Sequence, residues 1–254
     1  MTPFDELRAI VERLRAPEGC PWDRAQTPRS LRPYLVEETY EVIDAIESGD
    51  PEELRKELGD LLFQVMLLSE MAHQAGHFSI DEVAAGIAEK MVRRHPHVFE
   101  EGHEEDDAGT VAAWEARKAR ERGAGGSVLD GVPTALPALI RAHRVGEKVS
   151  RVGFDWSSAG GARDKVTEEL AELDEAMSTG DAERIRAEYG DVLLAMASLG
   201  RLLDIGPEEA LREANARFEQ RFRGVEGRVH GSGRLMAELS PEELEEHWEQ
   251  VKRC

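Results

Sequence analysis

Hydrophobic residues recur along the chain at the three- and four-residue spacing of helix faces. Near the start, Thr2 and Pro3 form a helix start signal, a cap followed by a first-turn proline. The apolar residues that follow it are Phe4, Leu7, Ile10, Val11 and Leu14. Alternating strand patterns and tight hairpin signals are nearly absent from the chain. The pattern therefore predicts an all-α protein.

One arrangement of acidic residues occurs twice. The motif EExxE spans residues 37–41 and recurs at 168–172, which is 131 positions later. An ExxD motif follows each copy at the same separation, at 57–60 and at 188–191. One EExxE can arise by chance in an acidic chain, but two copies with a fixed partner are not expected by chance. The repeat predicts a duplicated domain.

A short turn lies between the two motifs of each copy. Gly49-Asp50 occupies this place in the first copy, and Gly180-Asp181 occupies it in the second. Asp50 also precedes Pro51, which is a second helix start signal. Each copy is therefore expected to form an antiparallel helical hairpin that carries EExxE on one helix and ExxD on the other.

The domain boundary is expected in a stretch of small residues. Arg122-Gly-Ala-Gly-Gly-Ser127 has the composition of a flexible linker. We therefore expect a first domain over 1–122, a linker over 123–127 and a second domain over 128–254. The pairs Trp114/Lys118 and Trp248/Lys252 share the spacing WxxxK and are a further matched piece of the two domains.

The repeated carboxylates predict a metal site in each domain. Residues three or four apart share a helix face, so the acids of one hairpin converge between its helices. Crowded like charges repel unless a cation neutralises them, and hard divalent cations prefer oxygen ligands. The predicted ligands are Glu169, Glu172, Glu188 and Asp191, with a possible second set of Glu38, Glu41, Glu57 and Asp60. The expected ion is Mg²⁺, which also binds phosphates, with Mn²⁺ as a substitute. A solvated acidic helix face is the alternative.

Cations suited to a triphosphate are concentrated in the second copy. At the matched positions of the first copy, Lys165 is replaced by Tyr34 and Arg184 by Glu53. Asn215 and Arg217 are likewise replaced by Ala84 and Gly86, and only Arg221 keeps a basic counterpart, Lys90. Phosphoryl transfer depends on positioning and on charge stabilisation by metal and cationic side chains. The second domain is therefore predicted to be catalytic, and the first to be weak or inactive.

These motifs resemble the MazG family, within the all-α nucleoside triphosphate pyrophosphohydrolases. The similarity covers nearly the whole chain and includes the segments 128–133, 152–156, 215–218 and 221–222 and the closing WxxxK. The resemblance implies Mg²⁺-dependent hydrolysis of nucleoside triphosphates, with loose base preference, to the monophosphate and pyrophosphate. It also implies a homodimer, a catalytic second domain and a part in nucleotide-pool housecleaning or regulation.

Roles for individual residues follow from the motifs and the resemblance. The expected catalytic residues are Glu168, Glu169, Glu172, Glu188 and Asp191. Of these, Glu168 is the one free to orient or deprotonate the attacking water. The expected substrate-binding residues are Lys165, Arg184, Asn215, Arg217, Arg221, Trp248 and Lys252. The cations would neutralise phosphates, and Trp248 would stack on the base or else be an ordinary buried tryptophan.

Composition and charge limit the classes of partner that the protein is expected to bind. The formal net charge is −20, which excludes a broad nucleic-acid binder. The longest apolar stretch, around 61–68, is too short for a membrane span. The start of the chain lacks the basic and apolar regions of a signal peptide, and the two cysteines lie near opposite ends. A cytoplasmic protein without membrane or nucleic-acid partners is expected.

Three other interpretations remain open from the sequence. The acid clusters could bind a metal–nucleotide complex without catalysis, as a regulatory protein would. A di-iron bundle would use Glu70 and His73, but the matched positions hold Arg201 and Asp204, so that site would be half built. A metal site at His95, His97 and His103 is disfavoured, because these residues have no counterparts in the second copy.

Apolar residues on more than one helix face favour a homodimer.

Overall fold

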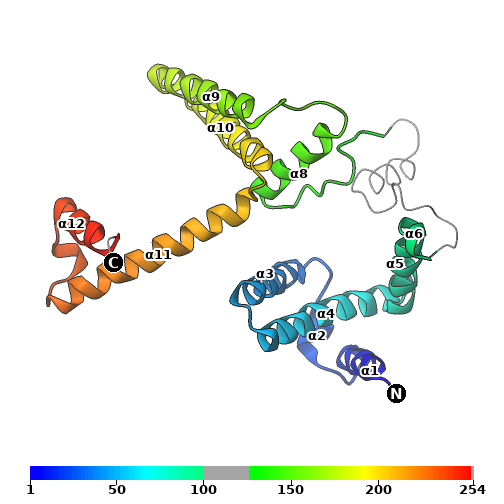
Figure 1. The fold of residues 1–254 in the computed structure, drawn as a ribbon. Helices are drawn as coiled ribbons and strands as arrows, with labels where there is room; N and C mark the ends of the chain where they lie inside the picture. Colours follow the sequence, from blue (N-terminus) through cyan, green and yellow to red (C-terminus); the bar gives the residue numbers. More distant parts are fainter. Residues whose placement is uncertain (100–125, 253–254) are drawn as a thin grey trace. The chain divides into compact units, whose positions relative to one another are not determined.

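The computed structural model describes residues 1–99 and 126–252. Every regular element in those ranges is helical, as the sequence predicts, and Figure 1 shows the helices along the chain. The chain divides into two units, Met1–Arg117 and Lys118–Cys254. The predicted linker, the motif at Trp114/Lys118 and His103 lie wholly or partly outside the described residues, so the boundary stays a prediction.

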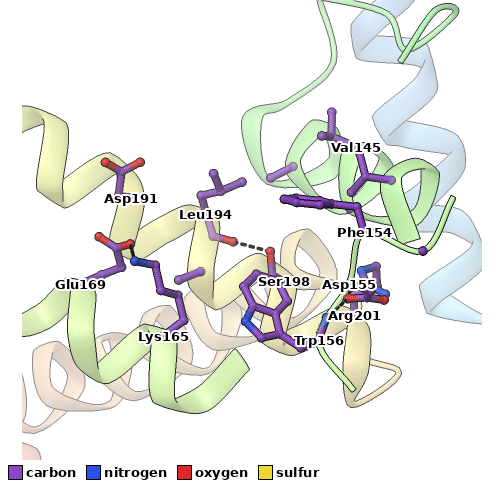
Figure 2. Close-up of a pocket in the computed structure, with 15 residues that line it drawn as sticks. Val145, Phe154, Asp155, Trp156, Lys165, Glu169, Asp191, Leu194, Ser198 and Arg201 are labelled. Atoms are coloured by element: carbon purple, nitrogen blue, oxygen red, sulfur yellow. Dashed lines mark hydrogen bonds and ion pairs between the residues drawn. The ribbon is translucent and has the colours of Figure 1, made fainter. Parts of the chain in front are cut away.

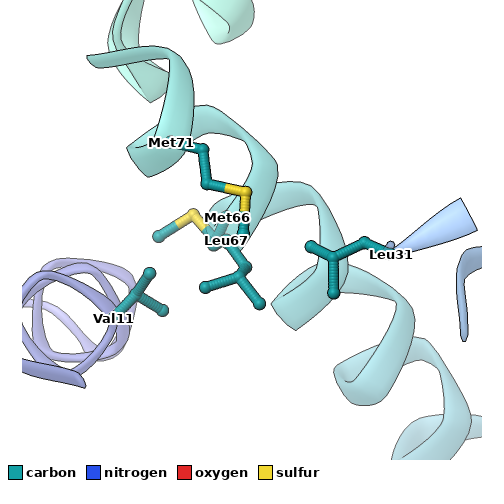
Figure 3. Packing of buried hydrophobic residues seen from close by; sticks show 5 residues of the cluster. All are labelled: Val11, Leu31, Met66, Leu67 and Met71. Atoms are coloured by element: carbon teal, nitrogen blue, oxygen red, sulfur yellow. The ribbon is translucent and has the colours of Figure 1, made fainter. Parts of the chain in front are cut away.

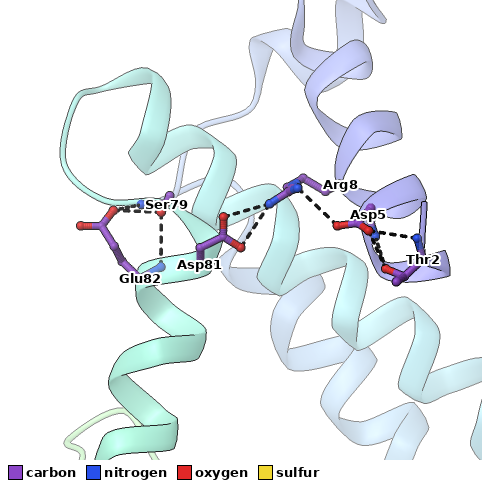
Figure 4. Close-up of polar contacts among 6 residues, drawn as sticks. All are labelled: Thr2, Asp5, Arg8, Ser79, Asp81 and Glu82. Atoms are coloured by element: carbon purple, nitrogen blue, oxygen red, sulfur yellow. Dashed lines mark hydrogen bonds and ion pairs between the residues drawn. The ribbon is translucent and has the colours of Figure 1, made fainter.

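The first unit contains six described helices. They are α1 (Pro3–Arg15), α2 (Pro21–Ala25), α3 (Arg32–Ser48), α4 (Pro51–Gln74), α5 (Ile80–Arg94) and α6 (Pro96–Phe99). The Thr2-Pro3 start signal is confirmed, because the Thr2 hydroxyl accepts from the Asp5 amide and the Asp5 carboxylate accepts from the Thr2 amide. Ser79 and Glu82 form the same capping box at the start of α5 (Figure 4). The Arg8 guanidinium then bonds the Asp81 carboxylate at 2.9 Å and ties α1 to α5.

The second unit repeats the helical hairpin of the first and extends it. Its elements are α8 (Ala138–Ser150), α9 (Ala159–Thr179), α10 (Ala182–Leu202), α11 (Pro207–Gly231), the short 3₁₀ helix η1 (Met236–Glu238) and α12 (Pro241–Lys252). Helices α9 and α10 pack along each other, and α8 contacts α10. In Figure 1, α11 leads away from this hairpin, and α12 lies against the half of α11 that is farther from the hairpin.

Both predicted hairpin turns are confirmed. Gly49 and Gly180 end α3 and α9 with φ of +71° and +70°, in the left-handed region that glycine adopts without steric cost. Asp50 and Asp181 then cap α4 and α10, because their carboxylates accept from the first backbone amides. The same two residues thus reverse the chain in each copy and place EExxE opposite ExxD.

The core of the first unit lies between α1 and α4. Val11, Leu31, Met66, Leu67 and Met71 form one buried cluster there (Figure 3). Leu31 and Leu67 are fully buried. Burial of large aliphatic side chains is the main stabilising term available to so small a unit. None of the described helices is long and apolar enough to cross a membrane.

Candidate active site

Each hairpin brings three glutamates together between its helices. The second acid cluster consists of Glu169 and Glu172 from α9 and Glu188 from α10, and one oxygen of each lies within 4.8 Å of the others. The first acid cluster, Glu38, Glu41 and Glu57, has the same arrangement on α3 and α4. These are six of the eight predicted metal ligands. The other two, Asp60 and Asp191, lie one turn beyond Glu57 and Glu188 on the same helices.

The fold disfavours the ionised form of carboxyl groups in both acid clusters. The pKa of Glu172 is raised, first by burial and then by the carboxylates of Glu169 and Glu188. The pKa of Glu38 is raised by burial, against a hydrogen bond from Gln64, and then by Asp60 and other carboxylates nearby. A raised carboxyl pKa means that the folded chain disfavours the ionised form. A bound cation would remove that penalty.

Lysine side chains partly neutralise the acids. Lys165 Nζ lies 2.7 Å from Glu168 Oε1 and 2.8 Å from Glu169 Oε1, which raises the pKa of the lysine. In the first unit the corresponding contact comes from the other helix, where Lys56 Nζ lies 2.7 Å from Glu57 Oε1.

The geometry fits a hard divalent cation. Opposite ligands of octahedral Mg²⁺ lie about 4.2 Å apart. The three oxygens of each cluster lie within 4.8 Å of one another. Adjacent ligands of the same ion lie about 3 Å apart, so side-chain rotations that draw the oxygens together would complete the site. All of the ligands are carboxylates, which is the chemistry that Mg²⁺ and Mn²⁺ prefer. The acid clusters can therefore hold a metal.

An open cavity of about 510 Å³ adjoins the second acid cluster. Glu169, Asp191 and Lys165 line its acidic end, as Figure 2 shows. The rings of Phe154 and Trp156 line its middle, together with apolar residues of α8 and α10. Its lining is mostly apolar with a few polar groups, as is usual for sites that bind small molecules.

A small residue lines this cavity at a position where the first unit has a large one. Ser198 lines the cavity, and its counterpart 131 positions earlier is the fully buried Leu67. Leu67 belongs to the buried core cluster of the first unit, whereas Ser198 faces a cavity in the second. This cavity was not predicted from the acid motifs, although the segment 152–156 already stood out in the sequence.

Other predicted residues fall into two groups. Lys165 and Arg184 lie at the second acid cluster, since Arg184 Nε is 3.7 Å from Glu188 Oε1. Asn215, Arg217 and Arg221 lie on α11, and Trp248 and Lys252 lie on α12. Within the described ranges, no hydrogen bond or ion pair joins these five to the second acid cluster. Trp248 instead packs on Phe218 with ring centroids 5.1 Å apart.

The histidine-based alternatives gain no support from the geometry. Across residues 1–99 and 126–252, the groups of side chains that can jointly hold a metal consist of glutamates alone. Glu70 and His73 line a separate small cavity beside Arg8 and Asp81. His95 and His97 lie with ring centroids 5.7 Å apart and join no such group.

Comparison with known proteins identifies the same repeat. The family described as the MazG nucleotide pyrophosphohydrolase domain matches residues 26–99 and 161–225. The chain is 45% identical over 258 positions to the nucleoside triphosphate pyrophosphohydrolase of Escherichia coli K12, covering all of this chain and 98% of that protein. It is 43% identical to the nucleoside triphosphate pyrophosphohydrolase/pyrophosphatase MazG of Thermotoga maritima, covering 98% of this chain and 95% of that protein. It is also 41% identical to the uncharacterized protein YabN of Bacillus subtilis, of which it covers 51%.

Removing one charge from the second acid cluster should stabilise the metal-free protein. We expect Glu172→Gln to raise the melting temperature in EDTA at pH 7, because the ionised carboxyl is disfavoured in the fold. A raised folded-state pKa gives no penalty below the ordinary value of 4.5 and the full penalty above the raised value. The gain should therefore vanish as the pH falls toward 4. Thermal unfolding monitored by circular dichroism across this pH range measures it.

Glu246→Gln, on the exposed side of α12, is the matched control and should change little. Added Mg²⁺ should stabilise the parent protein more than Glu172→Gln. A variant that is less stable than the parent in EDTA at pH 7 would show that this carboxylate supports the fold instead of straining it.

Proposed function

The chain belongs to the MazG nucleotide pyrophosphohydrolase family, and we propose that its second unit hydrolyses nucleoside triphosphates to the monophosphate and pyrophosphate with Mg²⁺. The observation that carries this assignment to the second unit is the cavity beside Glu169 and Asp191. A metal-binding cluster that opens into an apolar cavity suits a molecule with an anionic end and an aromatic end. We propose broad acceptance of bases and a role in maintaining the nucleotide pool.

The substrate would lie with its phosphates at the acid end and its nucleoside in the cavity. Glu169, Glu172, Glu188 and Asp191 would hold Mg²⁺, or Mn²⁺ in its place. The bound cation would supply positive charge to the phosphate oxygens. Lys165 already reaches this cluster and would move from Glu169 to a phosphate.

The chemistry requires one water molecule. Its oxygen forms a bond to the α-phosphorus while the bond from that phosphorus to the bridging oxygen breaks, and pyrophosphate leaves. Glu168 is the candidate to orient the water and accept its proton, because its side chain is more exposed than that of Glu169 and lies beside the cluster. Lys165 and Arg184 would stabilise the charge that moves onto the leaving group.

Among the described residues, the first unit has the acid cluster but lacks the matching cationic side chains and the cavity of the second unit. Tyr34 and Glu53 stand in place of Lys165 and Arg184, and the buried Leu67 stands where the second unit lines its cavity with a serine. We propose that this unit binds metal weakly or for structure and does not turn over nucleotides.

We also propose a homodimer. Large apolar side chains remain exposed on the helices of the second unit: Leu170, Met177, Tyr189, Leu193, Met196, Phe218 and Phe222. Association would remove this surface from water. It would also offer a way for Arg217, Arg221 and Trp248 of one copy to reach the acid cluster of another, which they do not contact in their own chain.

Catalysis should depend on the second acid cluster alone. Glu172→Gln removes a charged ligand while keeping the side-chain shape, so we expect turnover to fall at least 100-fold, with partial recovery at high Mg²⁺. Glu41→Gln changes the matched position of the first cluster and should leave turnover within about twofold. Release of pyrophosphate and monophosphate from a mixed nucleotide pool is the measurement. Loss of activity in Glu41→Gln alone would move the active site to the first unit, and no product from the parent protein would favour a binding protein without catalysis.

Filling the cavity should impair nucleotide binding without removing the metal site. Ser198→Leu introduces the residue found at the matched position of the first unit. We expect KM for nucleoside triphosphates to rise at least tenfold, because the added side chain occupies nucleoside space, while Mn²⁺ binding measured by calorimetry stays unchanged. Ser178→Leu, on an exposed face of α9, is the control and should leave KM unchanged. An unaltered KM in Ser198→Leu would place the nucleoside elsewhere.

The dimer can be tested by mass and by charge insertion. Light scattering at micromolar concentration should give twice the chain mass of 28.3 kDa. Phe218→Glu puts a charge on the exposed face of α11 and should shift the protein toward the monomer. A single monomeric species for the unmodified chain would refute the proposal.

A further inference from the structure

Arg201 lies at the end of the cavity opposite the acid cluster. It comes from α10, the helix that also carries Asp191, and both residues line the cavity. Ala195 and Ser198 line the stretch of α10 between them. Ten residues of helix separate Asp191 from Arg201, which is about 15 Å along the axis. Helix α10 therefore spans the cavity from its acidic end to its basic end.

The guanidinium of Arg201 is mostly buried and has few partners. Its side chain is only 12% exposed. Among the described residues its one hydrogen bond runs from Nη2 to Asp155 Oδ1, at 2.5 Å, and its buried Nε has no partner. A guanidinium carries five N–H donors and no acceptor. Buried donors are normally satisfied, so the guanidinium keeps donors beyond its bond to Asp155, and Arg201 is among the residues that line the cavity.

Local packing fixes the guanidinium in this place. A Cβ on Gly146 would lie 2.9 Å from Arg201 Nε, so the glycine of α8 makes room for the side chain. Asp155 also accepts from the Trp156 amide, which joins the aromatic segment to the arginine. The first unit has Glu70 at the position that matches Arg201. The donor group is therefore a feature of the second unit only.

We propose that Arg201 reads the outer edge of the nucleobase and favours bases that carry a carbonyl oxygen there. The proposal rests on the proposed function, because it places phosphates at Glu169 and the nucleoside between Phe154 and Trp156. A purine with O6, or a pyrimidine with O4, presents an acceptor to the guanidinium. Adenine and cytosine present an amino group at the same position, which sets donor against donor. The enzyme accepts both kinds of base but turns over the carbonyl kind more efficiently.

Isosteric substrate pairs isolate this contact. ITP and ATP differ at purine position 6 and the adjoining ring nitrogen, and UTP and CTP differ in the same way at pyrimidine position 4. We expect the full-length protein to show kcat/KM ratios of roughly tenfold or more for ITP over ATP and for UTP over CTP. Arg201→Met should bring both ratios to within about threefold of unity. Arg201→Lys keeps the charge but loses the planar fork, and it should give intermediate ratios.

The ratio of kcat/KM for two substrates distinguishes a contact between Arg201 and the base from a purely structural role of Arg201. If Arg201 and Asp155 were only a structural pair, Arg201→Met would lower kcat/KM for all four substrates equally and leave the ratios intact. Glu70→Met, at the matched position of the first unit, is the control and should leave the ratios unchanged. Ratios near unity in the unmodified protein, or ratios that survive Arg201→Met, would overturn the proposal.

Binding of reaction products keeps this test independent of catalysis. With Mg²⁺ present, IMP should bind more tightly than AMP by calorimetry, and Arg201→Met should remove the difference. A protein that prefers IMP but hydrolyses no triphosphate would refute the proposed function and keep the role of Arg201. A protein that hydrolyses triphosphates but binds IMP and AMP equally would refute the role of Arg201 and keep the proposed function.

Discussion

Repulsion among carboxylates that two antiparallel helices hold together is the constraint on which the rest of the molecule depends. Three glutamate oxygens lie within 4.8 Å of one another, and burial first, then the carboxylates of Glu169 and Glu188, raise the pKa of Glu172. The chain tolerates this because the helices are fixed by other means, namely the glycine turn, the aspartate cap and apolar packing. A cation that binds the acid cluster would remove this repulsion. The free energy that repulsion costs the metal-free fold therefore adds to the affinity for the cation.

The sequence was informative where the chemistry is local. Helix starts at Thr2-Pro3 and Asp50-Pro51, and the turns at Gly49 and Gly180, follow from residues that are adjacent in the chain. The convergence of the glutamates could also be predicted, because helix periodicity and one short turn are enough to place them. The exact duplication made these inferences stronger than either copy would have been alone.

The cavity could not be predicted in the same way. Its lining comes from α8, α9, α10 and the segment 153–156, which are far apart in the sequence. Ser198 is not unusual by itself, and only comparison with the buried Leu67 of the first unit shows what its small size achieves. From the sequence, Arg201 is only the position that lacks the histidine of a di-iron site, because what distinguishes it is burial beside a single described partner, Asp155. The predicted role of Asn215, Arg217 and Arg221 on α11 stays a prediction, because no hydrogen bond or ion pair among the described residues joins them to the second acid cluster.

The filled core of the first unit has a consequence for how the protein tolerates change. A duplicated chain has two equivalent bodies at the outset, and here one has closed its interior with Leu31, Met66 and Leu67. Substitutions in that interior alter how much folded protein a cell retains. With the nucleoside in the cavity, as we propose, substitutions around the cavity alter which molecules are processed, so abundance and selectivity depend on different units of one polypeptide. Selection can therefore change residues around the cavity of the second unit without first having to rebuild the buried core of the first.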